Sequence, residues 1–115
     1  QITHIALAGY LKLIPAFLIQ AYPQKIINLH PALLPKYGGK GMYGRHVHRA
    51  VKQNKETQSG ISIHLVNEKF DEGHLICQKS IDITKEDRVE DIEQKVRKLE
   101  HQFYPQAIHN YITSL

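Results

Sequence analysis

The stretch Ile27-Asn28-Leu29-His30-Pro31, with Leu33-Leu34-Pro35 close behind it, decides the fold of this chain. Apolar residues alternate with an amide and an imidazole, and a proline then ends the regular structure. In a β-strand, side chains two positions apart point to the same face, so Asn28 and His30 are expected to share one side of a sheet. A hydrogen-bond donor and a titratable group would then converge at the end of a buried strand. Open α/β sheets bind ligands at such places.

The residues before this stretch predict a strand and a helix. Residues 5–9 are an apolar run ending in glycine, which predicts a buried strand, and residues 16–21 follow Pro15 as a short helix that Pro23 ends. The next strand covers residues 25–30, and its continuous apolar run is typical of a strand covered on both faces. Strand, helix and strand in this order indicate a parallel pair with a right-handed crossover.

The residues after this stretch predict a long loop followed by a hairpin. The loop is rich in glycine and proline, which exclude regular structure, and it leaves directly from the strand end. Two runs with alternating apolar residues then indicate an antiparallel pair at one side of the sheet. In chain order, the expected elements are a loop at 31–44, a helix at 45–54, a strand at 59–66, a turn at 67–73 and a strand at 74–83.

The clearest helix of the chain is expected to begin at Asp87. Asp87-Arg88-Val89-Glu90 has the spacing of a capping box with Asp87 as the cap, and apolar residues then recur at steps of three and four as far as Phe103. Pro105 is expected to kink or end this helix, which resumes over residues 107–115. The sequence therefore predicts one α/β domain over residues 1–115, in which parallel strands and an antiparallel hairpin are flanked by helices.

The composition is ordinary for one soluble globular domain, with 115 residues, 42% hydrophobic and 23% charged. No apolar run reaches the roughly 18 residues that span a bilayer, and the first residues lack the zones of a signal peptide. We therefore expect a cytoplasmic protein with no membrane partner. The formal net charge of +4 suits phosphorylated or nucleic-acid partners, but the basic residues are scattered, so no nucleic-acid partner is expected. The sequence does not fix the oligomeric state.

The eight histidines invite a metal site that their spacing does not support. His46 and His48 stand two apart in a predicted helix, where they would face different sides, and no His-Glu-x-x-His pattern or cysteine pair occurs. Cys77 is the only cysteine, which excludes an internal disulfide, and it lies in an apolar run typical of a buried structural thiol. We expect no metal.

Asn28 and His30 are the residues best suited to chemistry. An amide that donates to an oxyanion and an imidazole that moves a proton are parts of an acyl-transfer site without a protein nucleophile. The turn Asp71-Glu72-Gly73 offers a carboxylate that would favour the imidazolium form and so raise the pKa of His30. These residues could instead satisfy loop backbone groups and shape a turn, and spacing alone slightly favours that structural interpretation.

Three segments carry a resemblance to a known family: residues 28–37 (NLHPALLPKY), residues 59–73 (SGISIHLVNEKFDEG) and residues 99–105 (LEHQFYP). In this order and at nearly this spacing, the chain resembles the C-terminal portion of the phosphoribosylglycinamide formyltransferase family. The resemblance implies a Rossmann-like formyltransferase fold. It also implies transfer of a formyl group from 10-formyltetrahydrofolate to the amine of glycinamide ribonucleotide in purine (IMP) biosynthesis, with small-molecule substrates and no metal.

The resemblance assigns roles residue by residue. Asn28 and His30 match the catalytic amide and imidazole that stabilise the tetrahedral oxyanion, and Asp71 matches the aspartate that supports this histidine. Ser62 and His64, on the polar side of their strand, are expected to support the site. The residues matched to folate binding are Leu11, Lys12, Leu13, Ile14, Asn67, Glu68, Lys69 and Phe70. Those matched to binding of glycinamide ribonucleotide are Arg97 and Glu100.

The chain also departs from the family pattern. Lys12 stands where arginine is usual, Glu72 and His74 stand where a small residue and proline are common, and the loop at 37–45 is longer than in many members. Nothing before Ile2 resembles the glycine-rich turn that holds the substrate phosphate in the family's N-terminal half. We therefore expect a fragment that lacks this half and has weak or no activity alone.

Three alternatives remain open from the sequence. A methionyl-tRNA formyltransferase-like enzyme shares the Asn-x-His-Pro-x-Leu-Leu-Pro core and suits the basic charge, but residues 36–39 and 62–64 fit the glycinamide enzyme better. The deformylase that hydrolyses the same folate usually lacks the pattern of residues 31–35. A non-catalytic folate-binding or scaffold domain is the alternative from another class, and it predicts unchanged behaviour after His30→Ala.

Overall fold

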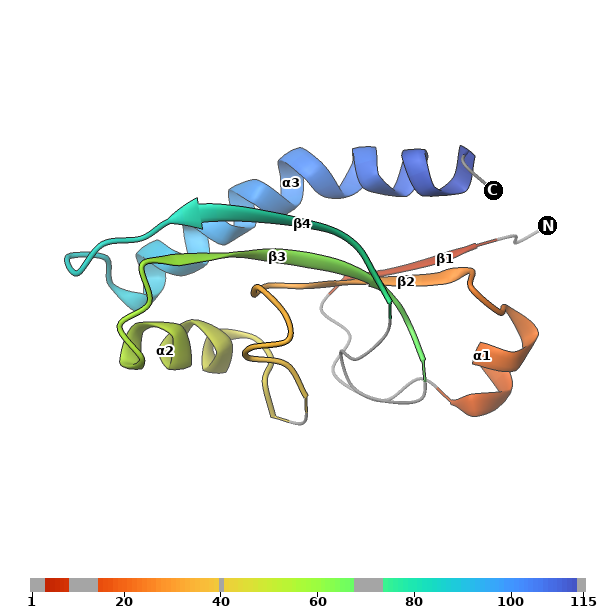
Figure 1. The fold of residues 1–115 in the computed structure, drawn as a ribbon, viewed down its shortest axis with the longest axis horizontal. Coiled ribbons are helices and arrows are strands. Elements are labelled where there is room, and N and C mark those ends of the chain that lie inside the picture. Colours follow the sequence, from red (N-terminus) through yellow and green to blue (C-terminus); the bar gives the residue numbers. More distant parts are fainter. Residues whose placement is uncertain (1–3, 9–14, 40, 68–73, 114–115) are drawn as a thin grey trace.

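The computed structural model describes residues 4–8, 15–39, 41–67 and 74–113. In these residues, four strands form one sheet in the order β1-β2-β3-β4, and helices lie on both of its faces. The strands are β1 (Ile5–Ala8), β2 (Ile26–His30), β3 (Gln58–Leu65) and β4 (Leu75–Asp82). The helices are α1 (Ala16–Ala21), α2 (Arg45–Gln53) and α3 (Val89–Thr113). Figure 1 shows α3 along one side of the sheet, with α1 and α2 on the other side.

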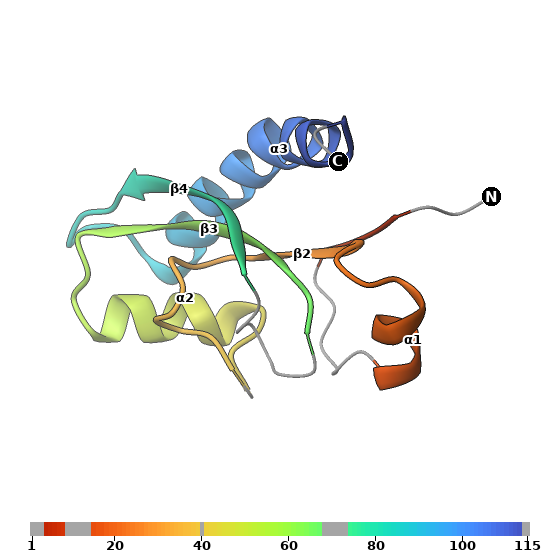
Figure 2. The ribbon, with the colours of Figure 1, turned by 45° about the vertical axis from the view of Figure 1, so that its right-hand side comes forward.

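The pairing of the strands confirms the predicted α/β topology. β1 and β2 are parallel and joined through α1, with Ile5 opposite Ile26. β2 pairs antiparallel with β3, and β3 pairs antiparallel with β4 as the expected hairpin at one side of the sheet. In Figure 2 the hairpin lies between α3 and α2, so the α2 side of β3 faces the loop that follows β2. The site described below lies in this region.

The core follows the period-two pattern of the strands. Ile27, Leu29 and Ile63 are at most 4% exposed and belong to one apolar cluster, which Ile92 and Val96 of α3 complete. Ile26, on the other face of β2, is also buried, so β2 is covered on both faces as predicted.

The prediction that the first strand is buried is wrong. Ala6 is exposed, and Ile5 and Leu7 are only half-buried. The physical reason is that, within the described residues, β1 pairs with β2 on one side and has no strand on the other. The predicted helix at 45–54 is confirmed as α2, because Val47 and Val51 share its buried stripe.

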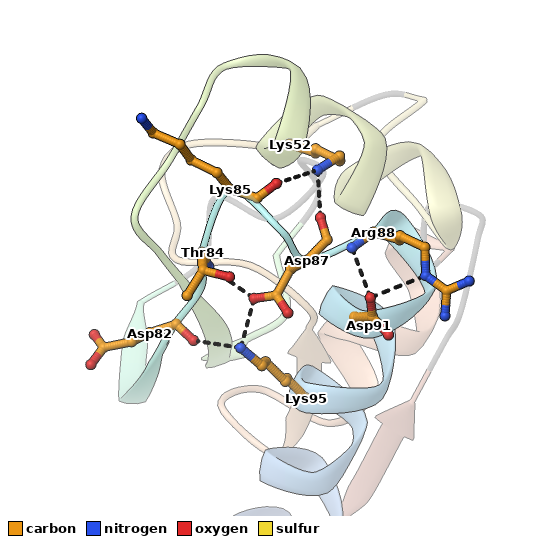
Figure 3. Close-up of polar contacts among 8 residues, drawn as sticks. All are labelled: Lys52, Asp82, Thr84, Lys85, Asp87, Arg88, Asp91 and Lys95. Atoms are coloured by element: carbon orange, nitrogen blue, oxygen red, sulfur yellow. Dashed lines mark hydrogen bonds and ion pairs between the residues drawn. The ribbon is translucent and has the colours of Figure 1, made fainter.

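The start of α3 corrects the predicted capping box by one residue. The Arg88 carbonyl accepts the first helical bond from Ile92 N at 3.0 Å, and Arg88 N donates to the Asp91 carboxylate at 2.8 Å. Asp87 therefore does not cap the helix. Its carboxylate accepts from Thr84 N at 2.8 Å and from Lys95 Nζ at 2.6 Å, and these bonds close the turn before the helix (Figure 3).

Of the two outcomes predicted at Pro105, a kink or an end, the end of the helix is wrong, since α3 runs without interruption from Val89 to Thr113 and includes the predicted helical residues 107–113. A proline removes only one backbone donor, and contacts on the second half of the helix compensate for it. The Tyr104 hydroxyl donates to the Leu7 carbonyl at 2.5 Å, and the Tyr111 hydroxyl donates to the Gln24 carbonyl at 2.7 Å. These two tyrosines fasten α3 to β1 and to the turn before β2.

The strands β3 and β4 approach each other closely at Gly60. A Cβ at Gly60 would lie 2.0 Å from the Lys79 carbonyl oxygen and 2.8 Å from Leu33 Cδ2, so the hairpin would have to open. We expect Gly60→Ala to lower the free energy of unfolding by about 1–3 kcal/mol, measured as a lower urea midpoint.

The matched control is the neighbouring Ser59→Ala. The Ser59 hydroxyl is buried and has no hydrogen-bond partner among the described residues, so its removal is expected to be neutral or slightly stabilising. An unchanged midpoint for Gly60→Ala would contradict the close approach of the two strands.

Candidate functional site

The register between β2 and β3 gathers four polar side chains on one face of the sheet. Asn28 lies opposite His64, and His30 lies opposite Ser62. We call these four residues the polar row. His30, Ser62 and His64 are at most 4% exposed, while Asn28 is half-buried. Asn28 and His30 therefore share a face as predicted, and they do so in a largely water-excluded place.

The Asn28 amide contacts His64 through its nitrogen, while its oxygen is buried without a hydrogen bond to any described residue. Its Nδ2 lies 3.4 Å from His64 Nε2, while His64 Nδ1 donates to the Leu65 carbonyl at 3.0 Å. A proton on His64 Nδ1 makes Nε2 the acceptor for the Asn28 amide. Asn28 Oδ1 is buried without a hydrogen-bond partner among the described residues. An orphaned amide oxygen beside a partly open surface favours a ligand there.

Ser62 fastens the loop that follows β2. Its hydroxyl donates to the Ala32 carbonyl at 2.6 Å and accepts from Leu34 N at 2.9 Å. Gln78 Nε2 donates to the Leu34 carbonyl at 2.8 Å, so β4 holds the same turn from the other side of β3. Ser62 thus holds the loop and His64 contacts Asn28, contacts that fit the supporting role expected from the sequence.

His30 is held by the loop itself. Its Nε2 donates to the Tyr37 carbonyl at 2.5 Å, so this nitrogen carries the proton. Nδ1 is then the nitrogen that gains a proton when the ring becomes charged. The Tyr37 contact orients the His30 ring.

A third buried histidine, His48, lies near His30, and its sequence position was tested above only for a metal site. His48 of α2 is 4% exposed, and its Nδ1 has no hydrogen-bond partner among the described residues. Burial lowers the pKa of His48, Glu93 opposes this shift, and the charges of His30 and Arg97 lower the pKa further. The neutral form of His48 is therefore favoured beside His30 and Arg97. Its position next to Val47 in the apolar stripe of α2 was the available signal.

Arg97 and Glu100, predicted to bind substrate, lie one turn apart on α3. Arg97 donates to Glu93 Oε1 at 3.0 Å, and Arg45 of α2 donates to Glu93 Oε2 at 2.9 Å. Glu100 is half-buried, and burial raises the pKa of its carboxyl against the opposing charges of Arg97 and His101. The structure thus places a desolvated carboxylate beside an ion-paired guanidinium on the helix that contacts β3.

Several predicted site residues lie outside the described part of the chain. They are Leu11, Lys12, Leu13 and Ile14 before α1, and Glu68, Lys69, Phe70 and Asp71 in the hairpin turn. Asn67 is described and is exposed directly after β3. Leu65 N donates to the His74 carbonyl at 2.8 Å, which closes the hairpin one residue beyond His64. The roles assigned to the undescribed residues stay predictions.

Two further observations concern metals and membranes. Among residues 4–8, 15–39, 41–67 and 74–113, no three His, Cys, Asp or Glu side chains stand together in a group fit for a metal ion. No helix in these ranges combines the length and the apolar character needed to cross a bilayer.

Cys77 was expected to be buried and is only half-buried, because β4 is an edge strand of the described sheet.

Comparison with known proteins identifies the class. The family described as formyl transferase matches residues 1–108, so the chain belongs to the formyl transferase family. The chain is 45% identical over 104 residues to phosphoribosylglycinamide formyltransferase, chloroplastic, of Arabidopsis thaliana, covering 90% of this chain and 36% of the relative. It is 45% identical over 108 residues to phosphoribosylglycinamide formyltransferase of Bacillus subtilis, covering 94% of this chain and 53% of the relative.

The fold comparison agrees. The crystal structure of phosphoribosylglycinamide formyltransferase from Bacillus halodurans superposes with a TM-score of 0.85 at 34% identity, covering 95% of this chain and 54% of that one. The predicted Rossmann-like formyltransferase fold is therefore confirmed. The chain spans about a third to a half of the length of these curated relatives.

Glu100 gives a pH-dependent prediction. Because burial raises the pKa of this carboxyl in the folded state, the folded protein binds a proton more tightly than the unfolded one. Stability should fall as pH rises from the ordinary pKa through the raised one, and then level off. We expect Glu100→Gln to have a higher melting temperature than wild type at pH 7, with the difference shrinking toward pH 4.

The matched control for this experiment is Glu90→Gln, at an exposed position of the same helix. Its melting temperature relative to wild type should not follow this pH pattern. A Glu100→Gln difference that is the same at pH 4 and pH 7 would contradict the burial of the Glu100 charge.

Proposed function

We propose that the protein containing this chain transfers a formyl group from 10-formyltetrahydrofolate to the amine of glycinamide ribonucleotide, and that the transfer takes place at the polar row. The observation that carries this proposal is the position of Asn28 and His30 on one largely buried face, where the Asn28 amide oxygen has no hydrogen-bond partner among the described residues. The names of the relatives support the same reaction. The proposed partners are therefore small molecules.

The proposed chemistry needs donors at the formyl oxygen and a route for one proton. As the amine nitrogen bonds to the formyl carbon, the C=O π electrons move to oxygen, and the Nδ2–H of Asn28 and the Nδ1–H of protonated His30 would stabilise the oxyanion. One such donor is worth about 3 kcal/mol of barrier. When the carbonyl re-forms, the bond from carbon to N10 of the folate breaks. The proton lost by the amine reaches N10 with the help of His30, Asp71 and water.

The remaining site residues are proposed to bind the two substrates. The segment of Leu11, Lys12, Leu13 and Ile14 and the segment of Asn67, Glu68, Lys69 and Phe70 would hold the pterin from two sides. Glu100 and Arg97 would bind glycinamide ribonucleotide. A half-buried carboxylate suits this task, because a substrate donor would relieve the cost of burying its charge. Arg97 would have to share or leave Glu93 to engage the substrate.

The relatives are longer than this chain, which matters for the activity expected of this chain alone. Their names fit glycinamide ribonucleotide rather than methionyl-tRNA as the acceptor, and the chain spans about a third to a half of their length. We propose that this chain supplies the formyl-transfer part. The phosphate-binding half expected from the family resemblance would be needed for full activity.

The direct test is formyl transfer by the full-length protein to glycinamide ribonucleotide, with methionyl-tRNA as the alternative acceptor. We expect His30→Ala and Asn28→Ala each to lower kcat by about 10²–10³-fold, the loss typical of one missing oxyanion donor. His109→Ala, an exposed histidine on α3, is the matched control and should keep wild-type activity.

Wild-type rates for His30→Ala would reject the catalytic assignment of His30, and the absence of formyl transfer by the wild-type protein would favour a scaffold role. Transfer to methionyl-tRNA in preference to glycinamide ribonucleotide would favour the other formyltransferase.

A further inference from the structure

The ring of His30 is oriented by a backbone atom of a loop that lies outside any regular element. Its Nε2 donates to the Tyr37 carbonyl seven residues later at 2.5 Å. A carbonyl in a loop is a reliable acceptor only if the loop is held at that point. The contacts that hold Tyr37 in place therefore also orient the His30 ring.

The backbone of Tyr37 has an unfavourable conformation. Its φ is +60°, the left-handed region that side chains other than glycine seldom adopt. Such a conformation costs free energy and persists only where surrounding contacts enforce it. Contacts that enforce it must exist near this residue.

The enforcing contacts come from the turn between α2 and β3. The Tyr37 hydroxyl donates to Glu56 Oε2 at 2.6 Å and accepts from Asn54 Nδ2 at 3.1 Å. The bond from Tyr37 lowers the pKa of Glu56, so this carboxylate stays ionised at neutral pH. Burial, followed by the bond to Glu56, raises the pKa of the Tyr37 phenol, which therefore stays protonated. Each partner keeps the other in the form that makes a strong hydrogen bond.

The Tyr37 ring packs against the apolar cluster and also borders a cavity of about 340 Å³, lined by Lys36, Tyr37, Glu56 and Ser59 among others. Hydrogen bonds therefore act together with packing to hold the ring in place. The first half of the loop is already pinned by Ser62 and Gln78. The Glu56 and Asn54 bonds supply the anchor for its second half.

We propose that Tyr37, Asn54 and Glu56 form a clamp that positions His30 for formyl transfer by holding the Tyr37 carbonyl against Nε2. The clamp acts through His30 and does not touch substrate, so its members are positioning residues. It keeps the proton on Nε2 and leaves Nδ1 as the nitrogen that exchanges a proton during the reaction. This inference rests on the proposed catalytic role of His30.

The kinetic test uses Tyr37→Phe in the full-length protein. We expect kcat for formyl transfer to fall about ten-fold with KM for both substrates within about two-fold, since misplacing a proton-transfer group affects the chemical step more than binding. Glu56→Ala should behave in the same way. Glu56→Gln still offers an oxygen to the Tyr37 hydroxyl and should recover at least half of wild-type kcat.

The matched control is Tyr43→Phe, an exposed tyrosine of the same loop whose ring packs edge-on against His46. It loses the same hydroxyl without the Glu56 contact and should keep wild-type kcat. An unchanged kcat in Tyr37→Phe overturns the proposal. So does an equal loss in Glu56→Gln and Glu56→Ala, which would indicate a merely structural role.

A spectroscopic readout separates the clamp from the catalytic assignment. The ¹⁵N shifts of the His30 ring, assigned by their absence in His30→Gln, should report the Nε2–H tautomer in wild type and a mixture of tautomers in Tyr37→Phe. This holds whether or not His30 is catalytic. If the tautomer shifts but His30→Ala stays active, the effect of the clamp on the His30 ring is correct and the proposed catalytic role of His30 fails. If the tautomer is the same in Tyr37→Phe as in wild type, the clamp is wrong.

Discussion

The antiparallel register between β2 and β3 is the constraint on which the site depends. With Asn28 opposite His64 and His30 opposite Ser62, all four polar side chains lie on one face and the intervening isoleucines and leucine lie on the other. A shift of one residue would turn every side chain of β2 to the opposite face. The buried apolar cluster under α3 opposes such a shift, because it would replace Ile27 and Leu29 in that cluster with polar Asn28 and His30. The same apolar packing that stabilises the sheet therefore also assembles the polar row.

Contacts from several elements hold the polar row and the loop beside it in place. His64 turns the Asn28 amide, Ser62 and Gln78 hold the loop at Leu34, and the Tyr37 carbonyl turns His30. On the other side of the core, α3 brings Arg97 and Glu100, and His48 of α2 senses the charges of both His30 and Arg97. Rigid supports of this kind are what a reaction at one shared oxygen atom needs, since donors must be in place before charge develops.

The sequence predicted the topology and the shared face of Asn28 and His30, because alternation and helical spacing are local signals. It failed where distant contacts override local rules. The capping box moved to Arg88 and Asp91 because Thr84 and Lys95 occupy the Asp87 carboxylate. The helix continued through Pro105 because Tyr104 and Tyr111 anchor it. The contact between His30 and the Tyr37 carbonyl had no sequence signal, since any residue type carries a carbonyl. The role of Asp71 stays a prediction from family resemblance.

Formyl transfer at the polar row is tested most directly by a crystal structure of the full-length protein with a folate analogue whose formyl group cannot be transferred. We expect the formyl oxygen to lie within hydrogen-bond distance, about 2.7–3.2 Å, of Asn28 Nδ2 and of a His30 ring nitrogen. A formyl group bound on another face of the sheet, out of reach of both side chains, would contradict it.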